Sequence, residues 1–69
     1  MFKEHDLNHK LVYFSLEWDE MISQWYMESM NKDYEFINNT FSSTTLDKNV
    51  AVKEARKYIK TTSLIKWNI

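Results

Sequence analysis

The sequence predicts an all-α fold, a single small domain over residues 1–69 built from three helices. The 69 residues include no glycine and no proline. Tight hairpins generally need glycine or asparagine at positive φ, which only Asn38-Asn39 could supply, whereas helices need neither glycine nor proline. Apolar residues also recur at alternating spacings of four and three, as they do on one face of a helix. A chain of this length suffices for one domain at most.

A long first helix, over residues 6–31, is predicted by six apolar residues at spacings of 4, 3, 4, 3 and 4. They are Leu7, Leu11, Phe14, Trp18, Met21 and Trp25. Ile22, Tyr26 and Met30 widen this stripe to the face of a helix that packs against a core. Asp6 is expected to cap its start and Asn31 to mark its end.

Two shorter helices follow in the prediction. Met30, Tyr34, Ile37 and Phe41 repeat the 4, 3, 4 spacing and predict a helix over residues 33–41 with Asp33 as its cap. The segment "SSTTL" (42–46) is expected to be a loop. Asp47 then caps a basic helix over residues 48–60, whose last turn carries Lys57 and Lys60, where positive charge complements the helix dipole. An irregular or extended tail ends the chain.

The alternative is an α+β fold with a small antiparallel sheet. In it "KLVYF" (10–14) is a strand and Ser15 caps a shorter helix over 16–31. "YEFI" (34–37) and "TFSST" (40–44) pair across Asn38-Asn39, and the tail, in which Ile65, Trp67 and Ile69 alternate, forms a fourth strand.

Composition bounds the class of protein. A domain this small buries only about 60% of its unfolded surface and needs some further source of stability. Cysteine is absent, so disulfides cannot supply it, and the eleven aromatic residues are the main internal resource. No segment approaches the roughly 20 apolar residues of a membrane span, and "MFKEHDLNHK" is too polar for a signal peptide. We therefore expect a cytoplasmic protein.

The net charge of −1 conceals an asymmetry. Residues 1–46 carry 3 basic and 8 acidic side chains, whereas residues 47–69 carry 6 basic and 2 acidic ones. Such a division indicates either a basic arm for nucleic acid or two halves that attract each other, within one chain or between two copies.

Catalysis, metal binding and cofactors are not expected. "HDLNH" (5–9) has two histidines four apart, but Asp6 stands where the zinc-peptidase helix carries glutamate, and no third histidine exists. If Asp6 caps a helix, His5 lies outside it and cannot share a face with His9. Acids such as Glu17 and Glu20 fit a solvated face, and glycine-rich phosphate loops are impossible in a chain without glycine.

The aromatic and methionine side chains of the first helix are the predicted site for a protein partner. Three small helices cannot enclose them all, and these residue types are enriched at interfaces. The predicted partner-binding residues are Trp18, Met21, Trp25, Tyr26, Met27 and Met30. Residues 16–37 also resemble the helical hook by which Sin-type repressors and antirepressors dimerise, with Glu17, Trp18, Glu20 and Met21 matching its start. That resemblance implies that two such helices can form a dimerisation hook. Homodimerisation through the same face, with the acidic first half of one copy facing the basic third helix of another, is the simplest form of the prediction.

The basic third helix is the alternative site, for nucleic acid. Its candidates are Lys53, Arg56, Lys57, Lys60 and Lys66, which could neutralise phosphates. Residues 52–67 resemble the opening helix-turn-helix of excisionase and MerR-type DNA-binding proteins through Lys53, Glu54, Ala55 and a helix start at Ser63. The turn glycine of that family is missing here.

The predicted function is thus non-enzymatic: a small interaction protein that binds and modulates another protein. Its abundance of lysine, asparagine and isoleucine, together with its size, suggests an accessory protein of a phage or mobile element acting on a host factor. The alternative function is a nucleic-acid-binding transcriptional regulator that uses residues 47–69.

Overall fold

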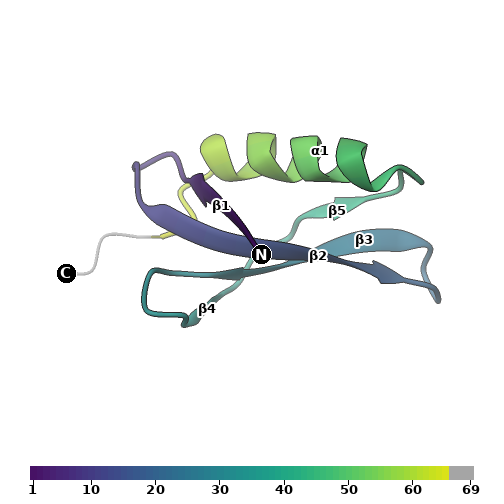
Figure 1. The fold of residues 1–69 in the computed structure, drawn as a ribbon, viewed down its shortest axis with the longest axis horizontal. Coiled ribbons are helices and arrows are strands. Elements are labelled where there is room, and N and C mark those ends of the chain that lie inside the picture. Colours follow the sequence, from purple (N-terminus) through teal and green to yellow (C-terminus); the bar gives the residue numbers. More distant parts are fainter. Residues whose placement is uncertain (66–69) are drawn as a thin grey trace.

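The computed structural model describes residues 1–65 and shows an α+β fold, with one helix across one face of an antiparallel sheet (Figure 1). The strands are β1 (Phe2–His5), β2 (Leu11–Asp19), β3 (Gln24–Met30), β4 (Phe36–Ile37) and β5 (Ser42–Ser43), and the helix is α1 (Lys48–Lys60). The prediction of an all-α three-helix protein is therefore wrong. The α+β alternative gives the right class.

Strands β2 and β3 form the centre of the sheet, where residues 6–31 were expected to be one helix. They pair antiparallel from Tyr13↔Met30 to Asp19↔Gln24, and β1 pairs antiparallel with β2 on the other side. Along β2, Val12, Phe14 and Leu16 are buried, while the residues between them are only half-buried. This alternation is the period of a strand. The helical stripe misled because Tyr13 and Leu11, on the opposite face, are also apolar and obscure the period of two.

Polar side chains form the turns that glycine usually makes. Asp6 is buried and its Oδ1 accepts hydrogen bonds from the backbone N–H groups of Asn8 and Lys10, at 2.9 and 3.0 Å. It organises the β1–β2 turn and does not cap a helix. Asn31 does the same in the next turn, where its Oδ1 accepts from the N–H groups of Asp33 and Glu35. Asparagine and aspartate can close turns in this way because their short side chains reach the backbone two residues on.

The predicted helix over 33–41 is also wrong, because this segment contains β4 and an irregular connection. Both β4 and β5 pair with β3, and not with each other as the α+β alternative expected. Between them, the Nδ2 of Asn39 donates to Met27 O at 2.9 Å and to Ser29 Oγ at 3.0 Å. The asparagine side chain thereby takes the place of a strand partner for the middle of β3.

The third predicted helix is present as α1, and Asp47 is its N-cap, accepting a hydrogen bond from Asn49 N at 2.8 Å. Its Ala51, Ala55 and Ile59 are spaced by four and completely buried. They pack on the sheet face that carries Val12 and Phe14. Small alanines let the helix approach the sheet closely, and the core forms between these two layers (Figure 1).

The segment after α1 is tied to the β1–β2 turn. Thr62 O accepts from Leu7 N at 3.1 Å, and Asp6 Oδ2 accepts from Ile65 N at 2.8 Å. Leu64 and Ile65 pack against the core without forming a strand. The remainder of the predicted extended tail, including Trp67, lies outside the described residues.

Candidate interaction surface

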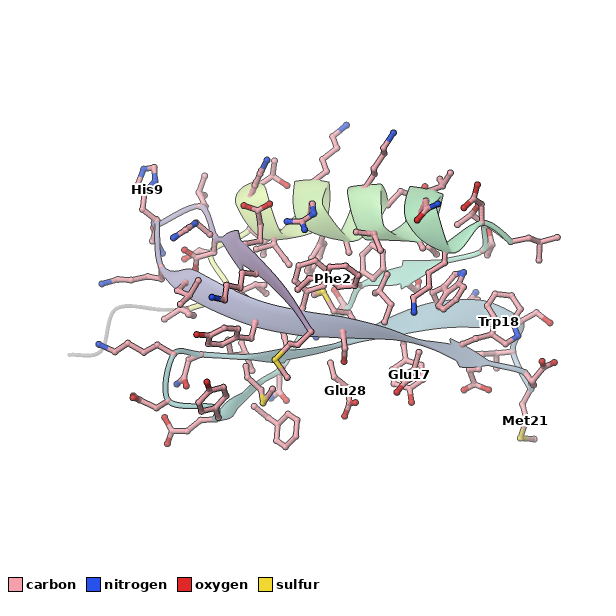
Figure 2. All side chains as sticks on the ribbon, viewed as in Figure 1. Phe2, His9, Glu17, Trp18, Met21 and Glu28 are labelled. Atoms are coloured by element: carbon pink, nitrogen blue, oxygen red, sulfur yellow. The ribbon has the colours of Figure 1, made fainter. Side chains whose placement is uncertain are left out.

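The sheet face turned away from α1 is the candidate site, and we call it the open face. Because side chains alternate along a strand, the buried Val12, Phe14 and Leu16 place the residues between them on this other face. The register then assigns their partners on β3 and β4 to the same face. The open face comprises Lys3, Tyr13, Ser15, Glu17, Tyr26, Glu28, Met30 and Phe36. In Figure 2, Glu17 and Glu28 point away from the helix.

One end of the open face is a cluster of large side chains. Tyr13 lies between Lys3 on β1 and Met30 on β3, and Met30 is paired with Phe36. The ring of Tyr34 stacks on that of Tyr13 with 5.2 Å between centroids. Phe36 is 75% exposed and Tyr34 64% exposed. Large apolar groups this accessible, gathered on one face, are typical of surfaces that bind a partner.

The position of Tyr34 is fixed at some conformational cost. Its φ is 63°, in the left-handed region that bulky residues rarely adopt. The Asn31 side chain holds the surrounding turn, and Tyr34 N donates to Asn31 O at 3.0 Å. Strained backbone of this kind persists when neighbouring contacts enforce it. The consequence is that the Tyr34 ring is presented on Tyr13 in a defined orientation.

The other end of the open face is acidic. Glu17 and Glu28 are exposed on β2 and β3, next to the half-exposed ring of Tyr26. Asp33 and Glu35 lie in the β3–β4 turn beside the aromatic cluster. Lys3 lies over the Tyr13 ring, with its Nζ 5.8 Å from the ring centroid. The surface thus combines an aromatic cluster at one end with carboxylates on both sides of that cluster.

The residues predicted to bind a partner do not share one surface. Tyr26 and Met30 lie on the open face. Met21, which is 95% exposed, lies at the tip of the β2–β3 hairpin (Figure 2). Trp18 and Trp25 form a cross-strand pair on the helix side, with ring centroids 5.4 Å apart, and Met27 is buried in the core. The helical hook implied by the Sin-type resemblance is absent from residues 16–37, which are mainly strand.

Sequence reasoning missed Tyr13, Tyr34 and Phe36 as surface residues. Tyr13 could have been found from the alternation of "LVYFSL", which places it opposite Val12 and Phe14 if the segment is a strand. No comparable signal exists for Tyr34 and Phe36, because β4 has only two residues and its position depends on the preceding turn. Their exposure follows from the tertiary structure.

Some basic residues of α1 form ion pairs with the sheet, and others are exposed to solvent. Arg56 Nη1 lies 3.1 Å from Glu4 Oε2 on β1, and Lys60 Nζ lies 3.7 Å from the same oxygen. Burial by itself would raise the pKa of Glu4, but the His5 N–H, the Arg56 guanidinium and the nearby Lys60 charge together hold it below its ordinary value of 4.5. Lys53 and Lys57 are exposed.

The structure also bears on the DNA-binding resemblance. After α1 ends, residues 61–65 contain a turn and irregular backbone and no second helix begins at Ser63. Lys66, the proposed groove contact, lies outside the described residues. Within residues 1–65 the recognition helix that the resemblance implied is therefore missing.

The histidine motif is not helical. His5 ends β1, and His9 lies in the following turn with a φ of 61°. Over residues 1–65, no three histidine, cysteine or acidic side chains gather where they could hold one metal ion. Over the same range, no helix has the length and apolarity that crossing a membrane requires.

Comparison with known proteins gives no relative. No family model matches the chain, and neither the curated proteins nor the solved structures include a match. The functional argument therefore depends on the surface described above.

Proposed function

We propose that this protein is a non-enzymatic interaction module that binds another protein through its open face. The observation that carries the proposal is the cluster in which the exposed rings of Tyr34 and Phe36 lie beside the half-buried Tyr13 and Met30. Aromatic residues and methionine are the types enriched in the buried centre of interfaces. The aromatic rings supply large contact areas at low cost in side-chain entropy, particularly when, as for Tyr34, the ring is already held in place.

The charges of the open face favour a partner with a basic surface. Glu17 and Glu28 lie on the face itself, and Asp33 and Glu35 lie at its border. These carboxylates would repel a phosphate backbone and attract lysine or arginine around an apolar patch. The proposed partner is accordingly a protein whose binding site is apolar at the centre and basic at the rim. The charge-rich, cysteine-free composition supports placing this encounter in the cytoplasm.

Nucleic-acid binding through α1 is the second candidate, favoured by the exposed Lys53 and Lys57. The ion pairs of Arg56 and Lys60 with Glu4 argue against this candidate, because a phosphate would have to compete with the Glu4 carboxylate for both basic side chains. Modulation of a host protein, as for a phage accessory factor, is compatible with the protein-binding proposal and stays a prediction.

A comparison of surface variants tests the proposal. Tagged wild-type protein is used to isolate partners from a nuclease-treated lysate of the cells that produce it. The same is done with Phe36→Ser, with Glu28→Lys and with Leu46→Ser, a matched control whose leucine is 87% exposed in the loop before α1. Circular dichroism verifies that each variant is folded.

We expect one protein to be retained by the wild type and by Leu46→Ser, lost with Phe36→Ser and reduced with Glu28→Lys. Nuclease should not release it. Binding that survives Phe36→Ser and Glu28→Lys, but disappears with nuclease or with Lys53→Glu, would refute the proposal in favour of nucleic-acid binding. In that case the affinity for nucleic acid should also fall steeply as the salt concentration rises.

A further inference from the structure

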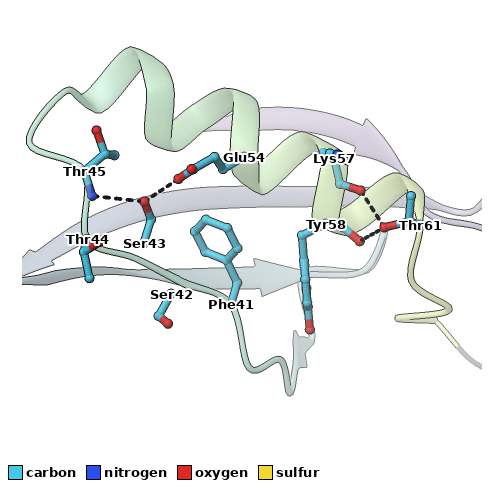
Figure 3. A pocket seen from close by; sticks show the side chains of 9 residues that line it. All are labelled: Phe41, Ser42, Ser43, Thr44, Thr45, Glu54, Lys57, Tyr58 and Thr61. Atoms are coloured by element: carbon cyan, nitrogen blue, oxygen red, sulfur yellow. Dashed lines mark hydrogen bonds between the residues drawn. The ribbon is translucent and has the colours of Figure 1, made fainter.

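A groove lies between β5 and α1, on the helix side of the sheet and separate from the open face. Its volume is about 720 Å³, and it is shown in Figure 3. Its lining residues come from two segments, 41–45 around β5 and 54–61 on α1. It exists because α1 packs mainly against β1 and β2 and leaves the β5 side of the sheet less covered.

Strand β5 is an edge strand held in an extended form. Among the described residues it pairs only with β3, through Trp25↔Ser43 and Tyr26↔Ser42. Antiparallel residues alternate between pairs that exchange hydrogen bonds with the neighbour and pairs that do not, so one residue of β5 directs its N–H and C=O outward. On either side, Asn39 Oδ1 accepts from Phe41 N and Ser43 Oγ accepts from Thr45 N, at 3.0 and 3.3 Å. These bonds fix the residues on either side of β5 and occupy the N–H groups of Phe41 and Thr45, so an added strand would have to pair between them.

The opposite edge of the sheet is protected. There the Arg56 side chain donates from Nη1 to the backbone oxygen of Lys3 on β1, at 2.8 Å, and α1 packs over the same strand. Capping of edge groups is a common way to prevent the addition of another strand. The helix therefore covers the β1 edge, whereas the side-chain caps near β5 lie on Phe41 and Thr45 and leave residues 42–44 beside the groove.

The groove offers distinct contacts to the side chains of an added strand. The rings of Phe41 and Tyr58, 5.7 Å apart, supply an apolar contact at one end. Glu54 is hydrogen-bonded to the Ser43 hydroxyl, whereas Lys57 is exposed and makes no ion pair within residues 1–65. The hydroxyl contact does not neutralise Glu54, so the groove carries one acidic side chain at Glu54 and one basic side chain at Lys57, and Lys57 is the one that attracts an acidic group of a ligand.

We propose that the β5 edge binds an extended peptide segment of a partner protein, which adds to the sheet as a further strand. Its backbone would pair with the one residue of Ser42–Ser43 whose N–H and C=O point outward. Of its groove-facing side chains, one would be apolar and contact Phe41 and Tyr58, and another would be acidic and face Lys57. Alternate residues of a strand reach the same side, so these two positions are separated by one residue. This surface is independent of the open face and does not rest on the function proposed above.

The test uses a library of random twelve-residue peptides displayed on phage. It is panned in parallel against immobilised wild type, Lys57→Glu and Lys57→Gln. We expect peptides enriched on the wild type to carry an apolar residue and, two positions away, aspartate or glutamate. Lys57→Glu should select lysine or arginine at that position, and should bind the wild-type peptide about tenfold more weakly, because attraction is replaced by repulsion.

The best peptide is then titrated into isotope-labelled protein, and amide shifts are followed by NMR. Shifts should be confined to residues 41–45 and 54–61, and Phe36→Ser should bind the peptide unchanged, which separates this site from the open face. The inference is overturned if no peptide is enriched, if Lys57→Glu selects the same peptides, or if the shifts map to the open face. Concentration-dependent shifts of residues 41–45 without peptide would overturn it too, because they would assign the edge to a second copy of the chain.

Discussion

Arg56 Nη1 and Glu4 Oε2 lie 3.1 Å apart and join the helix to the edge strand of the sheet. The same guanidinium donates to Lys3 O, and its carbon lies 5.6 Å from the centroid of the Phe14 ring. One side chain thus contacts the backbone, a carboxylate and the core at once. The side chain of Glu4 is only 13% exposed, which screens this pair less than a fully solvated one.

The ion pair predicts a pH dependence of stability. Because the pKa of Glu4 is lower in the folded state than its ordinary value of 4.5, the charged carboxylate stabilises the fold. This contribution is complete above the unfolded pKa and is lost as the pH falls through the folded one. We expect Glu4→Gln to lower the free energy of unfolding by about 1–2 kcal/mol at neutral pH. The difference from wild type should shrink toward about pH 3, as measured by urea unfolding.

Glu28→Gln is the control for that experiment, because it removes a carboxylate that is exposed on the open face. It should change stability by no more than about 0.5 kcal/mol at either pH. A wild-type to Glu4→Gln difference that is equal at both pH values would contradict the proposed role of the charge.

Asp6 is predicted to be the most sensitive polar residue. Its two oxygens accept from the N–H groups of Asn8, Lys10 and Ile65 and so link the first turn to the end of the chain. Asp6→Ala should cost about 3 kcal/mol or more, since hydrogen bonds to a charged group contribute roughly 1.5–3 kcal/mol each. A domain of this size has about 3–5 kcal/mol in total, so we expect much of the variant to be unfolded.

Asp6→Asn is the graded companion. It can keep the Oδ1 contacts to Asn8 and Lys10, but its amide group would face the Ile65 N–H, donor against donor. An intermediate loss of stability is expected in urea unfolding. If Asp6→Asn and Asp6→Ala were equally damaging, the contacts of Oδ1 would not be the main contribution.

The indole of Trp25 should stabilise the loop that leads into α1. Its Nε1 donates to Thr45 O at 2.9 Å. Trp25→Phe keeps an aromatic ring and removes this bond, which is worth about 0.5–1.5 kcal/mol. We expect the midpoint of thermal unfolding to fall by about 4–8 °C per kcal/mol lost. Trp18→Phe, on the other side of the same ring pair, is the matched control and should fall less.

The contact between helix and sheet depends on small side chains. Ala55 is completely buried, so Ala55→Leu must displace α1 from the strands beneath it. Overpacking of this kind costs about 1–3 kcal/mol. Val50→Leu adds a methylene at a position of the same helix that is 41% exposed and should be nearly neutral. If the two substitutions changed the free energy of unfolding equally in denaturant, the close contact between α1 and the sheet at Ala55 would not restrict side-chain size.

Sequence reasoning succeeded where the signals were local. Asp47, the apolar spacing of Ala51, Ala55 and Ile59, and the basic last turn together predicted α1 with its observed bounds. Local patterns gave the wrong prediction for β2 and β3, because apolar residues on both faces of β2 produce a spacing that also fits a helix. The absence of glycine misled for a related reason. That absence predicts few hairpins, but Asp19, Asn31 and Ser23 build the β2–β3 and β3–β4 turns without glycine.

The candidate site was only partly predictable for the same reason. Of the residues predicted to bind a partner, Tyr26 and Met30 lie on the open face, but Met27 and the two tryptophans lie on the helix side. Successive residues of a strand lie on opposite faces of the sheet. If a strand is predicted as a helix, the set of residues predicted to share a surface is therefore wrong as well.

The glycine-free turns have a consequence for mutational tolerance. A glycine turn depends on the conformational freedom of the backbone. Here the loops depend instead on hydrogen bonds made by the side chains of Asp6, Asn31, Asn39 and Asp47. In most small domains substitutions at polar loop positions are nearly silent. In this protein, saturation mutagenesis should therefore show a second set of intolerant sites, outside the core and spaced along the loops. At these sites, replacing the side-chain oxygen that accepts the backbone hydrogen bonds should disrupt the turn.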